Sequence, residues 1–223
     1  MKNEEIVASL LLKIGGMTFR FDPPYTYTTG LKSPIYLDNR LVMSYPKIRE
    51  KIIDYYIDVI KNEIGTKKVD WISATATTAI PHGAWVAHKL KLPLVFVRPT
   101  TKMAGVGKKT YGKGNKMEGY LKKGAKVVII EDHISTGTSA IDNAHAIREN
   151  GGKVNYCIAS TTYETKKAEK NFKENKIKLI TLTTGKIIVE TAYKEKKLNK
   201  KQKSVVDQWL HDPPSWAKKM GFE

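Results

Sequence analysis

Residues 127–140 read VVIIEDHISTGTSA, and this stretch decides the fold. Its first four residues are apolar and β-branched, a pattern typical of a buried parallel strand. The acids Glu131 and Asp132 follow, and a polar turn then leads into an amphipathic helix. A turn that enters a helix directs free backbone N–H groups and the positive end of the helix dipole at one point. The stretch therefore predicts a phosphate-binding turn beside two carboxylates, which suits a ribose phosphate.

Strand and helix patterns alternate along most of the chain. Strands are expected at residues 69–72, 94–97, 127–130, 154–159 and 177–182, and helices at 6–14, 46–60, 80–90, 140–147, 166–175 and 187–193. Strands separated by helices of this length predict the α/β class, with a doubly wound, mostly parallel sheet. Such sheets bind ligands beyond the carboxyl ends of their strands. The polar turn, the loop at residues 73–78 and the loop that begins at Arg98 are therefore expected to converge.

The composition bounds the class of protein. With 223 residues, of which 41% are hydrophobic, the chain can bury one substantial core. It has no apolar run near the roughly 18–20 residues that cross a bilayer, and its acidic N-terminus does not resemble a signal peptide. A single cysteine, Cys157, excludes an internal disulfide framework and a cysteine-based zinc site. We therefore expect a cytoplasmic protein without a membrane segment.

The formal net charge of +17 has two interpretations. Clustered lysine and arginine residues can bind the phosphates of nucleic acid, or they can attract a polyanionic small substrate. From Arg98 to Lys126 there are nine basic residues and one acid, directly before the polar turn, which favours the small substrate. Residues 194–203 hold six lysines and one acid, and this segment is expected to be a solvated linker. Nucleic acid is the less favoured partner.

The strand, the acid pair and the hydroxyl-rich turn with its glycine resemble the phosphoribosyl-pyrophosphate (PRPP) signature of the type I phosphoribosyltransferases. The resemblance implies that Glu131 and Asp132 hold the ribose 2′- and 3′-hydroxyls of PRPP. It also implies that the turn wraps the 5′-phosphate with backbone N–H and hydroxyl groups. The turn residues assigned to PRPP in this way are His133, Ile134, Ser135, Thr136, Gly137, Thr138 and Ser139. Mg²⁺ would bind through PRPP, without direct side-chain ligands.

A second segment narrows the family. Residues 29–40 read TGLKSPIYLDNR and resemble the N-terminal lid of the orotate phosphoribosyltransferases, whose pattern is SG-x-x-SP-x-Y-x-D-x-R. A lysine in this lid suits a substrate with a carboxylate, so Lys32 is the candidate for contact with orotate or pyrophosphate. Ser135 is the second candidate for orotate. The resemblance continues in four further places, which are residues 80–84, residues 112–119, Trp209 and residues 212–216.

The basic residues before the signature resemble the mobile loop with which this family supplies arginine and lysine to the departing pyrophosphate. Arg98 stands directly after a strand, and Lys109 with Tyr111 resembles the Lys-x-His-Gly piece of that loop. An alignment without a gap gives the lysine role to Lys102 instead, and the sequence does not decide between the two. The resemblance implies a homodimer in which this loop reaches into the partner's site. The candidate catalytic residues are Asp132, Glu131, Lys109 and Lys102.

Four features depart from the family pattern. The loop at residues 73–79 has alanine and threonine where the family has glycine, so added Cβ atoms are expected to crowd pyrophosphate. The segment between Arg98 and Tyr111 is longer than usual, and Tyr111 replaces a common histidine. Thr162 and Tyr163 stand where the family has an Asp-Arg pair that helps hold orotate. These departures bear on full activity more than on ancestry.

Two other kinds of site are excluded by spacing. A P-loop at residues 102–109 fails because Lys102 stands where glycine is required, and Lys109 where serine or threonine is required. His82, His88 and His145 do not have the spacing of a zinc site, and we expect them to lie on helix surfaces or in the core.

The resemblance implies an enzyme of pyrimidine and UMP biosynthesis, an orotate phosphoribosyltransferase that uses PRPP, orotate and Mg²⁺. Three parts are expected: a helix and lid over the base site at residues 1–40, the core at 41–193, and a lysine-rich linker with a C-terminal helix at 194–223. One alternative is a phosphoribosyltransferase that accepts a purine or uracil. The other is a PRPP-sensing regulator that binds nucleic acid, although no DNA-binding element is visible before the core.

Overall fold

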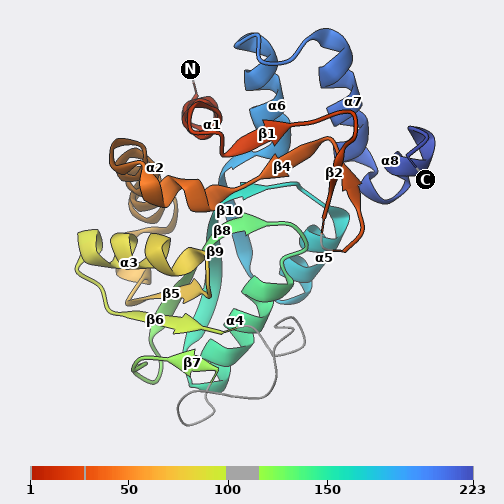
Figure 1. Cartoon of the computed structure of the whole chain (residues 1–223). Helices are drawn as coiled ribbons and strands as arrows, with labels where there is room; N and C mark the ends of the chain where they lie inside the picture. Colours follow the sequence, from red (N-terminus) through yellow and green to blue (C-terminus); the bar gives the residue numbers. More distant parts are fainter. Residues whose placement is uncertain (1, 28, 99–115, 223) are drawn as a thin grey trace. The chain divides into compact units, whose positions relative to one another are not determined.

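The computed structural model describes residues 2–27, 29–98 and 116–222 (Figure 1). The chain forms two compact units, of which one combines Met1–Arg49 with Thr183–Glu223 and the other is Glu50–Leu182. The boundaries of these units, after residues 49 and 182, differ from the expected part boundaries after residues 40 and 193. Segments from both ends of the chain pack into one unit. Among the described residues, no helix is both long enough and apolar enough to span a membrane.

The unit at residues 50–182 is built around a sheet that has six strands among the described residues, in the order β10-β9-β8-β5-β6-β7 (Figure 1). These strands are β5 (Trp71–Thr75), β6 (Leu94–Val97), β7 (Met117–Glu118), β8 (Lys126–Ile134), β9 (Lys153–Thr162) and β10 (Lys178–Thr184). β5 pairs in parallel with β6 and β8, and β8 pairs in parallel with β9, whereas β7 pairs antiparallel to β6. The expected α/β class and mostly parallel sheet are confirmed.

Helices cover both faces of this sheet. α3 (Ala79–Leu90) packs closely on β5, since a Cβ added at Gly83 would lie 2.7 Å from the Cβ of Ala74. α4 (Thr138–Glu149) carries Asn143, which hydrogen-bonds to Ser73 and Thr75. These two side chains alternate with that of Ala74 along β5, so α4 lies on the opposite face from α3. The unit also contains most of α2 (Pro46–Asp58), the π-helix Val59–Ile64, the 3₁₀ helix Thr66–Lys68 and α5 (Lys166–Glu174).

The central strand β8 is longer than the sequence pattern predicted. Residues 127–130 are buried, as expected for a strand covered on both faces. The prediction that the strand ends at Ile130 was wrong, because β9 continues to pair with β8 until Thr162 lies opposite Ile134. The acid pair therefore lies within the last residues of β8. The polar turn between β8 and α4 is confined to residues 135–137.

The other unit joins the two ends of the chain. α1 (Asn3–Lys13) packs on α6 (Gly185–Lys194), and α7 (Lys200–His211) packs on α6 and on α8 (Pro213–Lys219). Two small antiparallel sheets pair β1 (Met17–Phe19) with β4 (Ile35–Leu37) and β2 (Tyr25–Thr26) with β3 (Lys32–Ser33). The 3₁₀ helix Asn39–Ser44 follows.

The lysine-rich segment at residues 194–203 is not a simple linker. α6 includes Lys194, and α7 already begins at Lys200, where the Asn199 side chain accepts a hydrogen bond from the backbone N–H of Gln202. Lys203 Nζ then lies 3.3 Å from the Glu190 carboxylate on α6. These cap and ion-pair contacts order the ends of a segment that its charge alone predicted to be solvated.

His82 on α3 is buried without a full set of hydrogen bonds. Its Nδ1 lies 3.3 Å from the carbonyl oxygen of Thr78, and its buried Nε2 has no partner among the described residues. Burial lowers the pKa of His82 to about 4. Below pH 6.5 the unfolded chain therefore binds a proton that the folded protein does not bind, and stability falls as the pH decreases towards 4.

We expect His82→Met to reduce this acid sensitivity. The free energy of unfolding should fall less steeply, by about 1.4 kcal/mol for each pH unit between 6.5 and 4, because the buried titrating group is gone. Denaturant titrations at several pH values measure the slope. His88→Met is the matched control, since His88 lies exposed on the same helix. Equal slopes for the wild type and the His82 variant would contradict the prediction.

Candidate active site

The polar turn between β8 and α4 is held by side chains of α5 and of the residue that caps it. Thr165 Oγ1 donates a hydrogen bond to the carbonyl oxygen of Ser135 at 2.7 Å, and Asn171 Nδ2 donates to that of Thr136 at 2.8 Å. Gly137 has a φ of 76°, in the left-handed region that favours glycine. The first N–H groups of a helix have no acceptor within that helix, so those at the start of α4 can donate to an anion.

The side chains of the turn differ in exposure. Ser135 and Thr138 are exposed, and Thr136 and Ser139 are half-buried. The hydroxyl oxygens of Thr136 and Thr138 lie 3.0 Å apart. Ile134 is buried in the core, so any contact of this residue with a phosphate would come from its backbone. Four hydroxyl groups are thus present on the turn and the first residues of α4.

The two acids of the signature lie in different surroundings. Glu131 is only 5% exposed, and it lies beside Thr75, because the preceding residues Ala74 and Ile130 pair across β5 and β8. Burial raises the pKa of Glu131 well above its usual value, and the neighbouring charge of Asp132 raises it further. Asp132 is half-buried. Asp132 is therefore the acid that is more open to a ligand, whereas Glu131 is enclosed by protein.

Tyr56 on α2 fixes the backbone beside the acids. Its hydroxyl donates to the carbonyl oxygen of Glu131 at 2.5 Å and lies 3.0 Å from Oγ of Ser160. Burial raises the pKa of Tyr56, so the hydroxyl stays protonated and able to donate. From the sequence, Tyr56 was expected only to lie within the helix at residues 46–60. A buried tyrosine hydroxyl predicts that some partner exists, but the sequence does not identify it.

His133 extends towards β9. Its Nδ1 lies 2.9 Å from Oγ1 of Thr161, and its ring meets that of Tyr163 edge to face with 4.4 Å between the ring centroids. Burial lowers the pKa of His133 to about 4, so the ring is neutral near pH 7. Thr162, one of the two residues that replace the expected Asp-Arg pair, is buried opposite Ile134. An aromatic contact between His133 and Tyr163 thus stands where an arginine was expected.

Arg98 directly follows β6, and contacts with residues in and beside the edge strand β7 hold it in place. Its Nη2 lies 2.9 Å from the Glu118 carboxylate on β7, and its backbone N–H donates to the carbonyl oxygen of Lys116 at 2.8 Å. The two residues that border the undescribed segment therefore meet. Three predicted site residues belong to that segment and lie outside the described residues, namely Lys102, Lys109 and Tyr111.

Lys32 lies on the β2–β3 hairpin of the other unit. Its Nζ donates to Oγ1 of Thr26 at 2.9 Å, and its carbonyl oxygen accepts a hydrogen bond from Nε1 of Trp209 at 2.9 Å. The ring of Trp209 also meets that of Tyr27 edge to face, with 6.2 Å between the centroids. The tail residue Trp209 thus packs on the hairpin that carries the candidate lysine.

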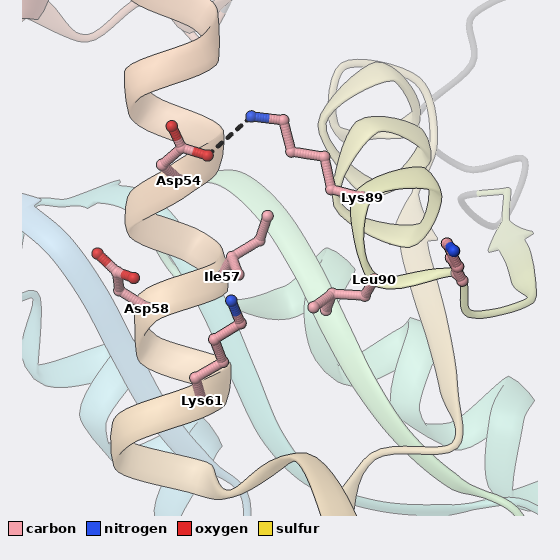
Figure 2. Close-up of a pocket in the computed structure, with 7 residues that line it drawn as sticks. Asp54, Ile57, Asp58, Lys61, Lys89 and Leu90 are labelled. Atoms are coloured by element: carbon pink, nitrogen blue, oxygen red, sulfur yellow. Dashed lines mark hydrogen bonds and ion pairs between the residues drawn. The ribbon is translucent and has the colours of Figure 1, made fainter.

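A hollow of about 430 Å³ lies between α2 and α3, apart from the predicted site (Figure 2). Its lining residues are Asp54, Ile57, Asp58, Lys61, Lys89, Leu90 and Lys91. Figure 2 shows Lys89 pointing to Asp54, with 2.7 Å between Nζ and Oδ1. Because none of these residues belongs to the polar turn, the acid pair or the lid, we do not assign the hollow to substrate.

Comparison with known proteins gives a consistent set of relatives. The chain is 39% identical over 218 residues to an orotate phosphoribosyltransferase of Listeria innocua, with 98% of this chain and all of that one covered. It is 41% identical over 214 residues to one of Fusobacterium nucleatum, with 95% and 97% covered. The crystal structure of the Aeropyrum pernix orotate phosphoribosyltransferase has the same fold, with a TM-score of 0.70 at 24% identity over 86% of this chain and 99% of that one. No protein-family model matches the chain.

Proposed function

The chain belongs to the orotate phosphoribosyltransferase family, and on this premise we propose how its residues carry out the transfer. The enzyme moves the ribose 5-phosphate group of PRPP to orotate. The bond between the ribose C1′ and the pyrophosphate oxygen breaks, a bond from C1′ to a ring nitrogen of orotate forms, and orotidine 5′-monophosphate and pyrophosphate are released. This reaction belongs to pyrimidine biosynthesis.

We assign the 5′-phosphate of PRPP to residues 135–139. The observation that carries this assignment is the left-handed Gly137 at the start of α4, with the preceding carbonyl groups engaged by Thr165 and Asn171. Charge-assisted hydrogen bonds to such a turn contribute about 1.5–3 kcal/mol each. Several of them would support micromolar binding after the cost of association.

The acid pair holds the ribose in this proposal. Asp132, the more exposed acid, accepts hydrogen bonds from the ribose hydroxyls, and Glu131 supports it from its enclosed position. The transition state has positive charge near C1′, so a fixed carboxylate on the ribose stabilises it more than it stabilises the ground state. Neither acid acts as a nucleophile. The contribution of the protein is to orient the ring and exclude water.

Basic residues offset the charge of the departing pyrophosphate, and Mg²⁺ would supply further positive charge when bound. Arg98 and the loop lysines Lys102 and Lys109 are our candidates among the side chains, with Tyr111 as a further contact. Mg²⁺ prefers oxygen ligands and often binds through substrate phosphates, and the acids at the end of β8 give this site the required oxygen chemistry. The ion would be held through the pyrophosphate and ribose oxygens of PRPP, which Glu131 and Asp132 orient.

Orotate is assigned to Lys32 and Ser135. Lys32 supplies a cation for the orotate carboxylate, and Ser135 has an exposed hydroxyl at the start of the polar turn. We further propose a cytoplasmic homodimer in which the loop after Arg98 serves the partner's site. The support for the dimer is the family resemblance of that loop, and sedimentation equilibrium measures the oligomeric state.

Trp209→Phe is expected to raise the KM for orotate about threefold. The change removes the N–H donor to the Lys32 carbonyl oxygen while keeping an aromatic ring, and a neutral hydrogen bond of this kind contributes about 0.5–1.5 kcal/mol. Steady-state kinetics with orotate and PRPP varied separately measure the effect. The KM for PRPP should stay within about twofold, because the contact concerns only the lid.

The chain offers a matched control for this variant. Trp216 is equally buried, and its Nε1 donates to the carbonyl oxygen of Val205 at 3.2 Å. Trp216→Phe removes the same kind of donor, but the lost bond is to Val205 and not to Lys32, so the KM for orotate should stay unchanged. Equal effects of the two variants on that KM would reduce Trp209 to a stabilising residue.

The acceptor is tested by comparing product formation from PRPP with orotate, uracil and hypoxanthine. We expect turnover with orotate alone. Faster turnover with uracil or a purine base would overturn the assignment of Lys32. Tight, salt-sensitive binding of RNA or DNA without any orotate turnover would favour a regulator, which is the alternative that the net charge of +17 suggests.

A further inference from the structure

Three buried residues form a chain of hydrogen bonds that ends beside Glu131 of the acid pair. Ser73 Oγ donates to Oδ1 of Asn143 at 2.7 Å, and Nδ2 of Asn143 donates to Oγ1 of Thr75 at 3.0 Å. Thr75 lies beside Glu131, because the preceding residues Ala74 and Ile130 pair across β5 and β8, and the Thr75 hydroxyl favours the charged form of the Glu131 carboxyl group. The three residues of the chain and Glu131 are each at most 5% exposed. Such a buried network is costly unless every member is satisfied, which makes its arrangement specific.

The chain of hydrogen bonds has a direction that Asn143 sets. A hydroxyl group has one hydrogen to donate. Because Nδ2 of Asn143 can only donate, Thr75 accepts from it and keeps its own hydrogen for Glu131. The donation from Ser73 to Oδ1 holds the amide in this orientation. With the amide reversed, Oδ1 would take the hydrogen of Thr75, and the carboxylate of Glu131 would lose its donor.

The network connects three parts of the candidate site. Asn143 lies on α4, the helix whose first residues we assign to the 5′-phosphate. Ser73 and Thr75 belong to residues 73–79, which the sequence predicted to be a loop facing pyrophosphate; that prediction was wrong for residues 73–75, which are the end of β5. Glu131 lies on β8 beside Asp132, the acid that we assign to the ribose hydroxyls. The backbone of Glu131 is held separately by Tyr56, so the network acts on its side chain.

We propose that Asn143 is a positioning residue for PRPP, because it directs the Thr75 hydroxyl to Glu131 and thereby fixes the acid pair against the ribose. The inference rests on the proposed role of the acid pair, in which Asp132 binds the ribose hydroxyls and Glu131 supports it. It makes Thr75 and Asn143 determinants of PRPP binding, although neither is expected to touch orotate. Substitution of a residue with only a packing role would change the stability of the protein. It would leave the ratio of the KM for PRPP to the KM for orotate unchanged.

The test is a double-mutant cycle with kinetic readout. Thr75→Val keeps the shape and removes the hydroxyl, and we expect the KM for PRPP to rise about fivefold, equivalent to about 1 kcal/mol. The kcat and the KM for orotate should stay within about twofold. Thr75→Ser restores the hydroxyl and should restore the KM for PRPP. Asn143→Ala should raise that KM about threefold in the wild type and not at all in the Thr75→Val background, because Thr75 transmits its effect.

Thr191→Val is the matched control, since Thr191 is a buried threonine on α6, in the other compact unit. It should leave both KM values unchanged, and thermal unfolding checks the fold of each variant. If Asn143→Ala does not fold, the comparison of Thr75→Val with Thr75→Ser decides alone. An unchanged KM for PRPP in Thr75→Val, additive effects in the cycle, or an equal rise in the KM for orotate would overturn the inference.

Failure of the proposed function is a separate outcome. A wild-type enzyme that makes no product from orotate would overturn the function assigned above. In that case calorimetric titration of PRPP into the wild type, Thr75→Val and Thr75→Ser still tests the network. Weaker PRPP binding by the valine variant alone supports the inference, and equal binding by all three contradicts it.

Discussion

Asp132→Asn is expected to lower kcat/KM for PRPP by at least about tenfold, a loss of about 1.4 kcal/mol or more in transition-state stabilisation. The substitution keeps the size of the side chain and removes the negative charge that we place on the ribose hydroxyls. Asp132 is half-buried and its charge raises the pKa of the enclosed Glu131, so removing that charge relieves a repulsion. The free energy of unfolding should therefore not decrease.

Initial rates at varied PRPP concentrations measure this effect, together with denaturant unfolding of the same preparations. Asp54→Asn is the control, because Asp54 is an acid on α2 whose ion pair with Lys89 lies outside the predicted site. It should keep the wild-type kcat/KM. An unaltered rate for the Asp132 variant would remove the acid pair from the mechanism.

Gly137→Ala is expected to lower the free energy of unfolding by about 2–4 kcal/mol and to weaken PRPP binding severely. The left-handed φ of 76° costs a residue with a Cβ about 1–2 kcal/mol. The new Cβ would also lie 2.7 Å from Cε2 of Phe172 on α5, so the turn or the ring must move. A displaced turn no longer presents its N–H groups in the geometry that a phosphate requires.

Gly124 provides the comparison that separates these two costs. Its φ is 82°, and a Cβ added there would meet nothing within 4 Å. Gly124→Ala should therefore lose only the backbone cost and keep its affinity for PRPP. Denaturant unfolding and calorimetric titration of PRPP measure both quantities. Equal losses of stability in the two variants, with PRPP affinity retained in the Gly137 variant, would argue against the role of the turn.

The sheet could be predicted because its signal is local. Apolar runs separated by helical stripes predict a parallel sheet, and the six strands among the described residues follow the order of a doubly wound fold. The end of β8 could not be predicted in the same way. Glu131 and Asp132 are polar, and they continue the strand only because β9 supplies partners as far as Thr162. The same limit applies to Asn199, whose cap orders a segment that charge alone predicts to be solvated.

The residues of the candidate site could likewise be predicted only in part. The acids and the turn lie within one short stretch, so the sequence could identify them together, and their roles in binding stay predictions. Tyr56 and Thr75 act on this stretch from afar: Tyr56 is 75 positions from Glu131, and Thr75 is 68 positions from Asn143. No local pattern predicts that these side chains meet. The burial of Glu131 also depends on tertiary packing, which is why the two acids looked equivalent in the sequence.

The most direct test of the account is a crystal structure of this enzyme with PRPP and Mg²⁺ bound. We predict that the 5′-phosphate accepts hydrogen bonds from the backbone N–H groups of residues 136–139. The ribose 2′- and 3′-hydroxyls should donate to the carboxylate of Asp132, and Glu131 should accept a hydrogen bond from Thr75. A 5′-phosphate bound away from the turn, or a ribose without contact to either acid, would contradict the account.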